Sequence, residues 1–368
     1  MADTLRLNPH VAELPLYNAG MNIAVARSKT GLTDIAALAS NENPYGCSPK
    51  VTAALASLDP SRYADPACVI LRDALSRKIG VAGNRIVIGN GSEEMIAAVC
   101  RAVLRPDATV VAMIPGFGLH EIEPRANGAK IIKIPMTKDL RFDLEAMTTA
   151  LREKPSIFFI SSPSNPVGPA LRQDQLSGLI AAVPKETLLV FDEAYFEFCD
   201  GNTPDGLKTL ADSAISWVVL RTFSKAYGLA GLRVGWALAP DWLTPGLNLF
   251  RGVGNVNAIA QAAAAAAVED QVFVDRVVAE THAERAFLAR HLARLGLHFV
   301  PGFGNFLLTR FPDAEAKSAA KFIDFAMRKR GIWLRPVGEP GFANWSRIGL
   351  GNRAENELLV RFLEGFLK

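Results

Sequence analysis

The feature of this sequence that most constrains its fold is a series of short apolar runs separated by longer amphipathic stretches. The runs lie at residues 85–88, 109–113, 157–160 and 188–191. Continuous apolar runs of this length are typical of buried parallel strands. Strands that alternate with helical stretches favour a sheet covered by helices. The sequence therefore predicts an α/β fold with a mostly parallel sheet.

The same pattern divides the chain into three regions. Residues 1–40 carry turn residues with little periodicity, and we expect an N-terminal arm that approaches the smaller domain. Residues 41–250 carry the alternating pattern and should form the large, ligand-binding domain. Residues 251–368 should form a connecting helix and a smaller α+β domain, with a hairpin over 297–311 and a helix over 314–330.

One lysine lies in a distinctive loop after a further apolar run, at residues 217–220. Thr222 and Ser224 come just before Lys225, and a glycine-containing turn and Arg233 follow it. A lysine amine can form a Schiff base with an aldehyde. Hydroxyl and guanidinium groups are the donors that a phosphate dianion needs. The loop therefore suits pyridoxal 5'-phosphate, which carries both groups, although an isolated lysine would be interpreted as a surface residue.

Polar side chains also follow the run at 188–191. Asp192 comes directly after it and Tyr195 three residues later, at the edge where open α/β sheets bind their ligands. Asp192 could keep a pyridine nitrogen protonated, which makes the ring an electron acceptor. Tyr195 could hydrogen-bond the phenolic oxygen of the ring. The alternative for an isolated aspartate is the capping of a helix.

Two further turns follow apolar runs. Asn165 precedes a proline, which favours extended backbone, so its amide can point into the cleft. Gly91 and Ser92 precede an expected helix with Glu93 in its first turn. The N-terminus of a helix favours a bound phosphate. The alternative for this segment is a plain Asn-Gly turn.

Taken together, these motifs resemble those of the fold-type-I pyridoxal-phosphate enzymes, the aspartate aminotransferase superfamily. The resemblance runs from Tyr17 to the final helix and is strongest to the class II aminotransferases, the histidinol-phosphate aminotransferases in particular. The combination of Asp192, Lys225 and Arg233 is its most specific part. Weaker support comes from residues 38–46, 61–63, 89–94 and 346–351.

The resemblance implies a role for each matching residue. Lys225 would bind the cofactor aldehyde and Asp192 its ring nitrogen; with Tyr195 they are the expected catalytic residues. Phe117 would stack on the ring. Tyr63 would reach the cofactor phosphate of the neighbouring subunit, so that a homodimer shares its active sites. The expected cofactor-binding residues are Tyr63, Gly91, Ser92, Glu93, Phe117, Asn165, Asp192, Tyr195, Thr222, Ser224, Lys225 and Arg233.

The expected substrate site includes two arginines near the C-terminus. Arg347 matches the position that binds the anionic group of the substrate across the superfamily. Arg335 matches an arginine that helps to bind a substrate phosphate in the histidinol-phosphate aminotransferases. Tyr17 and Asn165 complete the expected set. The ordinary alternative for either arginine is a surface salt bridge.

The resemblance implies a transamination between a small-molecule amino donor and a 2-oxo acid. The expected pair is L-histidinol phosphate and 2-oxoglutarate, in histidine biosynthesis. An aromatic amino acid aminotransferase, with Tyr17, Phe117 and Trp333 in the pocket, stays open as an alternative. So do a threonine-phosphate decarboxylase and, from a different class, a non-catalytic regulatory or scaffold protein on the same fold.

Three positions depart from the commonest family pattern. Gly116 stands where a small hydroxyl residue is common, His120 where tyrosine is frequent, and Ser164 where asparagine is frequent. These departures leave the cofactor motifs intact, and we expect any effect in the substrate pocket.

Composition excludes several classes of protein. The net charge of +3 and the absence of a Lys/Arg cluster argue against a nucleic-acid partner. Neither the 4 cysteines nor the 5 histidines show metal-ligand spacing, so we expect no metal and free thiols in a reducing compartment. The N-terminus lacks the pattern of a signal peptide, and the Ala-rich run at 258–268 is too short for a membrane span. These features predict a cytoplasmic protein with no membrane partner.

Overall fold

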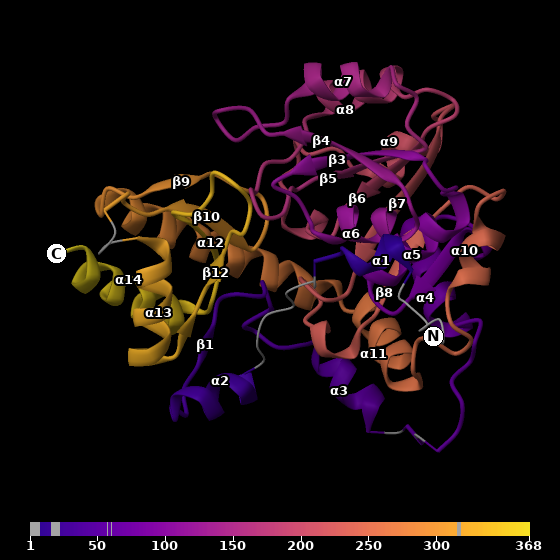
Figure 1. Ribbon diagram of the computed structural model, residues 1–368. Coiled ribbons are helices and arrows are strands. Elements are labelled where there is room, and N and C mark those ends of the chain that lie inside the picture. The colour runs from indigo at the N-terminus through magenta and orange to yellow at the C-terminus, as the bar shows by residue number, and fades with distance from the viewer. Residues whose placement is uncertain (1–7, 16–22, 57, 60, 315–317) are drawn as a thin grey trace, which may run out of the picture.

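The structure is a computed structural model that describes residues 8–15, 23–56, 58–59, 61–314 and 318–368. A large domain surrounds a long twisted sheet, and a smaller domain holds the C-terminal end of the chain (Figure 1). A long helix, α12 (Gln271–Arg294), runs from one towards the other.

The sheet of the large domain is mostly parallel, as the apolar runs predict. Its strand order is β2-β8-β7-β6-β5-β3-β4. The pairs β3–β4, β3–β5, β5–β6 and β6–β7 are parallel, whereas β8 is antiparallel to both of its neighbours. The strands are β2 (Ile86–Gly89), β3 (Thr109–Ile114), β4 (Lys130–Pro135), β5 (Ile157–Ser161), β6 (Leu188–Asp192), β7 (Ser216–Thr222) and β8 (Gly235–Leu238).

The central strands of the sheet are mostly apolar because helices cover both of its faces. In β5, Phe158 and Ile160 belong to one core cluster, and Ile157 and Phe159 to the other. Burying each such side chain contributes about 1.5–3 kcal/mol. One face is covered by α3 (Pro49–Leu55), α4 (Val69–Ile79), α7 (Leu144–Leu151), α8 (Gln173–Ala182), α9 (Gly206–Ala211) and α11 (Ala258–Val268), and the other by α5 (Ser92–Val103), α6 (Leu119–Ala126) and α10 (Thr244–Phe250).

The small domain combines an antiparallel sheet with two helices, α13 (Ala319–Arg330) and α14 (Arg353–Leu367). Its strand order is β12-β13-β10-β9, from β9 (His298–Val300), β10 (Phe306–Arg310), β12 (Arg335–Pro336) and β13 (Trp345–Gly349). The antiparallel β9–β10 pair confirms the expected hairpin. Side chains from α12, α13 and α14 pack with the sheet in one core, through Leu288, Phe322 and Leu359.

The N-terminal part of the chain is joined to the small domain. After α1 (Pro9–Ala12) and α2 (Ile23–Thr30), the short strand β1 (Ala36–Ala37) pairs in parallel with β11 (Ile332–Trp333). Residues 38–43, called the strap below, then pass to the large domain. The proposed domain division at about residue 250 remains a prediction. The packing of α11 against α3 and α4 favours a change of domain further along, within α12.

Three short 3-10 turns complete the described elements: Gly83–Arg85, Phe196–Phe198 and Ala230–Leu232. The third follows Lys225 and fixes the end of its loop. Arg233 comes next with a left-handed backbone (φ 55°), which turns the chain directly into β8. The loop that carries Lys225 is therefore anchored on both sides by strands of the large sheet.

Candidate active site

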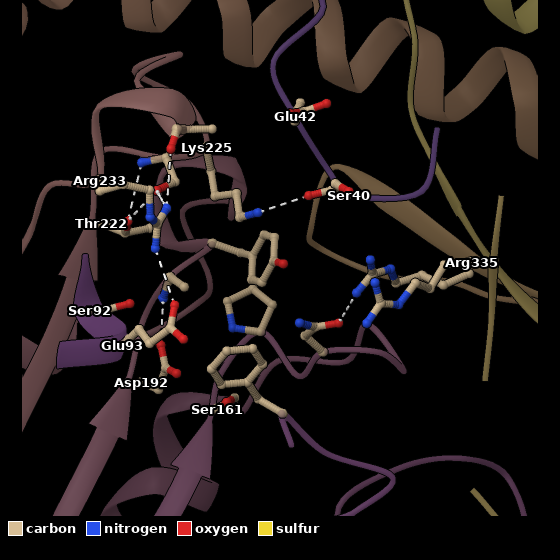
Figure 2. A pocket seen from close by; sticks show the side chains of 18 of the residues that line it. Ser40, Glu42, Ser92, Glu93, Ser161, Asp192, Thr222, Lys225, Arg233 and Arg335 are labelled. Carbon is tan, nitrogen blue, oxygen red and sulfur yellow. Dashed lines mark hydrogen bonds and ion pairs between the residues drawn. The ribbon is translucent and has the colours of Figure 1, made fainter. Parts of the chain in front are cut away.

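A cavity of about 540 Å³ lies where β5, β6 and β7 end and the small domain begins (Figure 2). The carboxyl ends of adjacent parallel strands meet at one edge of a sheet, which explains why loops distant in sequence gather here. Its lining includes Ser40, Glu42, Ser92, Glu93, Phe117, Ser161, Asn165, Asp192, Tyr195, Thr222, Ser224, Lys225, Arg233, Arg335 and Arg347.

Lys225 extends into the cavity from the loop after β7, and its Nζ donates a hydrogen bond to the Ser40 carbonyl oxygen at 3.1 Å. Burial, together with the positive charge of Arg347, lowers the pKa of this amine to about 7. The Glu42 carboxylate raises the pKa, but by less than Arg347 lowers it. A lysine with such a pKa is largely able to act as a nucleophile or a base near neutral pH.

A cradle for an anion lies on one side of Lys225. Thr222 Oγ1 and Ser224 Oγ lie 3.0 Å apart, and Arg233 Nη1 lies 3.5 Å from Ser224 Oγ. Ser92 begins α5, whose first backbone N–H groups are unpaired within the helix. Gly91, with φ 82°, makes room for the arginine, because a Cβ there would lie 2.8 Å from Arg233 Nη2.

Glu93 lies at the edge of this cradle and forms an ion pair with Arg233, at 3.2 Å between Oε2 and Nη2. Both side chains are about half exposed. The pair holds the guanidinium next to the N-terminus of α5. The charge of Arg233 and the positive end of the helix dipole therefore face the same space.

Asp192 is buried at the end of β6. Its Oδ1 accepts the Ala194 N–H at 3.0 Å, and its Oδ2 lies 3.2 Å from Nε2 of His120. The His120 ring stacks on Phe159 with centroids 4.7 Å apart and meets Phe117 edge-on. The carboxylate is thus fixed from β6 and from α6, and it lines the cavity.

Arg335 lies across the cavity from Lys225 and the cradle (Figure 2). Arg335 and Arg347 are paired across β12 and β13, so both guanidinium groups line the same end of the cavity. Arg347 Nη1 donates to Asn165 Oδ1 at 2.6 Å, and its Nη2 donates to the Ala39 carbonyl oxygen of the strap. Two cations on neighbouring strands favour a doubly charged anion.

A comparison with known families identifies the kind of enzyme. The family model for aminotransferases of class I and II matches residues 33–363. The chain belongs to this family. It is therefore a pyridoxal-phosphate-dependent transferase, as its motifs predict.

Relatives and solved structures agree with this assignment over nearly the whole chain. The aminotransferase is 39% identical to a histidinol-phosphate aminotransferase of Akkermansia muciniphila, over 98% of each chain. It is 37% identical to histidinol-phosphate aminotransferase 3 of Rhizobium meliloti, over 97% of this chain and 96% of the relative. A crystal structure of histidinol-phosphate aminotransferase from Sinorhizobium meliloti, in complex with pyridoxal-5'-phosphate, superposes with a TM-score of 0.91 at 29% identity, covering 100% of this chain and 98% of that one.

The cavity of the aminotransferase fits this cofactor in the chemistry of its donors. The hydroxyls, the guanidinium and the helix N-terminus suit a phosphate dianion. Lys225 offers an amine with a lowered pKa to an aldehyde, and the buried Asp192 carboxylate lies on the next strand, β6. The structure thus brings the expected residues of one chain together around a single cavity, apart from Tyr63 among the described residues.

Among the described residues, one expected contact of the cofactor, Tyr63, is not brought to this cavity. Tyr63 is fully exposed, at 105% relative exposure, and does not line the cavity of its own chain. Tyr17 lies outside the described residues. Trp333, which the aromatic-substrate alternative places in the pocket, is instead buried in a cluster with Ala39 and Met327. That part of the alternative is wrong, because the strand pairing of β11 with β1 turns this side chain away from the cavity.

The three departures from the family pattern have different consequences. A Cβ at Gly116 would lie 2.3 Å from the Met113 carbonyl oxygen, so the local backbone has no room for a larger residue. Ser164 is buried, and its N–H donates to the Pro169 carbonyl oxygen; its side chain does not line the cavity. His120 alone contacts a residue expected to be catalytic, Asp192.

The sequence motifs did not assign a role to the strap, yet it borders the cavity. Ser40 and Glu42 line it, and Asn41 donates from Nδ2 to the Tyr195 hydroxyl oxygen at 3.0 Å. The run of polar residues before Pro44 was the available signal. Its contacts with Lys225 and Arg347 span 185 and 308 residues of sequence, which no local pattern reveals.

Within the described part of the chain, no group of three His, Cys, Asp or Glu side chains is arranged to hold a metal ion. Nor is any described helix both long and apolar enough to cross a membrane.

Proposed function

We propose that this aminotransferase transfers the amino group of L-histidinol phosphate to 2-oxoglutarate. The observation that carries the proposal is the pairing of Arg335 and Arg347 on neighbouring strands at one end of the cavity. Histidinol phosphate has no α-carboxylate, so its phosphate is the anionic group that these two arginines would bind. The names of the relatives over nearly the whole chain support the same substrate.

The roles of the chain's own residues follow from their positions. Pyridoxal 5'-phosphate, when bound, supplies an electron-accepting ring that stabilises negative charge on the carbon beside the transferred amine. Lys225 acts as the base, because its lowered pKa lets the amine take the proton from the substrate carbon near neutral pH and give it back. Asp192 holds a proton on the ring nitrogen. Phe117 and Asn165 line the same cavity and would hold the ring when the cofactor is bound.

The substrate end of the site is organised by Asn165. Its side-chain oxygen accepts from Arg347, which leaves its amide N–H₂ to face the cavity. Arg347 is in turn held by the Ala39 carbonyl oxygen, so its guanidinium is positioned before the substrate arrives. A preorganised cation loses less entropy on binding than a free one.

We also propose a homodimer in which Tyr63 completes the cradle of the partner chain. Tyr63 is exposed, and so are large apolar side chains at the start of α4, in α10 and just after it: Ile70, Leu249 and Val253 are 74%, 81% and 98% exposed. Arg251 Nη2 donates to the Pro66 carbonyl oxygen and so joins the segment that follows Tyr63 to the segment that follows α10. Exposed apolar surface of this kind commonly marks a protein interface.

The experiment that tests the proposed substrate compares specificity constants for histidinol phosphate, phenylalanine, tyrosine and threonine phosphate. We expect the largest kcat/KM for histidinol phosphate. An aromatic amino acid that exceeds it by more than about tenfold, a difference of about 1.4 kcal/mol in transition-state binding, would contradict the assignment. Release of carbon dioxide from threonine phosphate would identify a decarboxylase instead.

A further inference from the structure

Asn41 is a buried strap residue that the proposed function does not use. Its side chain is only 2% exposed, and its backbone is left-handed, with φ 54°. Asparagine adopts this conformation more readily than most residues other than glycine. The strap therefore turns at Asn41 so that the side chain points towards the end of β6, where Tyr195 lies 154 residues away in sequence.

The contact between the two side chains fixes where the Tyr195 proton can point. Asn41 Nδ2 donates to the Tyr195 hydroxyl oxygen at 3.0 Å. The hydroxyl accepts on that side, so its own hydrogen must be directed elsewhere. The Tyr195 ring is held edge-on against Phe306, with centroids 5.2 Å apart, and the residue lines the cavity. With Asn41 on one side of the oxygen, the hydrogen is left free to point into the cavity.

The orientation of the Asn41 amide has a physical reason. As placed, Oδ1 of Asn41 is buried without a hydrogen-bond partner among the described residues. The reversed amide would instead leave the N–H₂ group without an acceptor there. A buried oxygen without a partner is tolerated better than buried N–H groups without one. The donating orientation is therefore the favoured one.

Asn41 is also fixed through its main chain. Its carbonyl oxygen accepts from Asn305 Nδ2 at 3.0 Å, from the turn before β10 in the small domain. Asn43 Nδ2 donates to the Ala226 carbonyl oxygen at 3.0 Å, next to Lys225. The strap is thus held on both sides of Asn41. The side chain has little freedom to hydrogen-bond a different partner.

We propose that Asn41 is a positioning residue. It orients the Tyr195 hydroxyl so that this group donates a hydrogen bond to the ring oxygen of the bound cofactor. The inference rests on the proposed function, in which the chain binds pyridoxal phosphate, and on the contact of Tyr195 with that oxygen which the family resemblance implies. A hydroxyl that accepts a hydrogen bond becomes a stronger donor, because successive hydrogen bonds polarise one another. Asn41 acts on the ring through Tyr195 and makes no contact with it.

The test is the pH at which the visible absorption band of the cofactor-loaded enzyme titrates. A donor held against the ring oxygen stabilises the deprotonated form and lowers this pH. Asn41→Gly keeps the left-handed backbone and removes the donor. We expect it to raise the midpoint by about half a pH unit, as the loss of one neutral hydrogen bond implies. Asn41→Asp, which also offers an acceptor to the Tyr195 proton, should raise it more.

Two comparisons decide whether the effect passes through Tyr195. In a Tyr195→Phe background, Asn41→Gly should leave the midpoint unchanged. Asn43→Ala removes another anchor of the strap and should also leave it unchanged. An unshifted or lowered midpoint in Asn41→Gly, an equal shift in Asn43→Ala, or a shift that persists without the Tyr195 hydroxyl would each overturn the proposal. Failure of the proposed function would look different, because the wild-type chain would then prefer another substrate while the Asn41 variants still shifted the midpoint.

Discussion

We expect one atom of the site, Lys225 Nζ, to act both as the nucleophile and as the base. Lys225→Ala should lower turnover by at least about a thousandfold, because it removes both the nucleophile and the base. The visible band that the wild-type enzyme forms with the cofactor should also be lost. Turnover and absorption spectra measure the two effects. Lys208→Ala is the matched control, since the Lys208 side chain is 86% exposed. Substantial transamination by Lys225→Ala would refute the assignment.

Glu42 should tune the reactivity of Lys225 in the cofactor-free enzyme. A pKa of about 7 means that the amine is mostly protonated below pH 7 and reactive above it, far below the usual range of a lysine. The rate at which the free chain captures pyridoxal phosphate should therefore rise with pH around a midpoint near 7. The Glu42 carboxylate raises the pKa of Lys225, so Glu42→Gln should move this midpoint down.

Glu42→Asp provides the comparison, because it keeps the charge and changes only its reach. Stopped-flow absorbance at a series of pH values measures both variants. A midpoint that stays in place in Glu42→Gln would show that this carboxylate has no electrostatic influence on the amine.

At the scale of secondary structure, the proposed substrate preference depends on the pairing of β12 with β13. Arg335→Ala should weaken the phosphorylated substrate by about 1.5–3 kcal/mol, the usual contribution of a charge-assisted hydrogen bond, and an aromatic amino acid by less. The kcat/KM values of histidinol phosphate and phenylalanine measure the difference. Arg310→Ala, on β10 and paired with Asp313, is a control from the same sheet. Equal losses for both substrates would argue against a phosphate site.

The end of β3 imposes a constraint of a different kind. Gly116→Ser would restore the hydroxyl residue common in the family, but its Cβ would lie 2.3 Å from the Met113 carbonyl oxygen. We expect a loss of about 1–3 kcal/mol in the free energy of unfolding, as for other overpacked sites. Denaturant unfolding measures it. Gly178→Ser, on the exposed side of α8 with no atom within 4 Å of the new Cβ, should change stability much less.

Sequence patterns predicted those elements whose signal is local. The continuous apolar runs gave β2, β3, β5, β6 and β7, because parallel strands covered on both faces need no polar alternation. They missed β4 at the sheet edge, where Lys130 and Lys133 interrupt the apolar residues, and they also missed β8. The cradle and Lys225 were predictable because they follow strands directly. The contacts of Asn41 and of His120 were not, since each depends on segments that meet only in the folded chain.

At the scale of the whole molecule, the proposed dimer is needed to complete the site. A hybrid of one Lys225→Ala chain and one Tyr63→Phe chain should contain one intact site, formed by Lys225 of one chain and Tyr63 of the other. Mixing the two weakened variants should therefore restore part of the activity. Activity of the mixture and mass in solution check this together. A fully active monomer would rule out shared sites.

The hydrogen bonds of the strap also bear on the order in which the enzyme can be assembled during synthesis. Consecutive strap carbonyls, from Leu38 to Asn41, accept from Gly349, Arg347, Lys225 and Asn305 in turn. The strap is synthesised before the rest of the site, but two of its hydrogen bonds form only after β13, near the end of the given sequence, has been synthesised. A nascent chain can complete the large sheet beforehand, but not the pocket. Catalytic competence should then arise in one late step, when β13 docks on the strap.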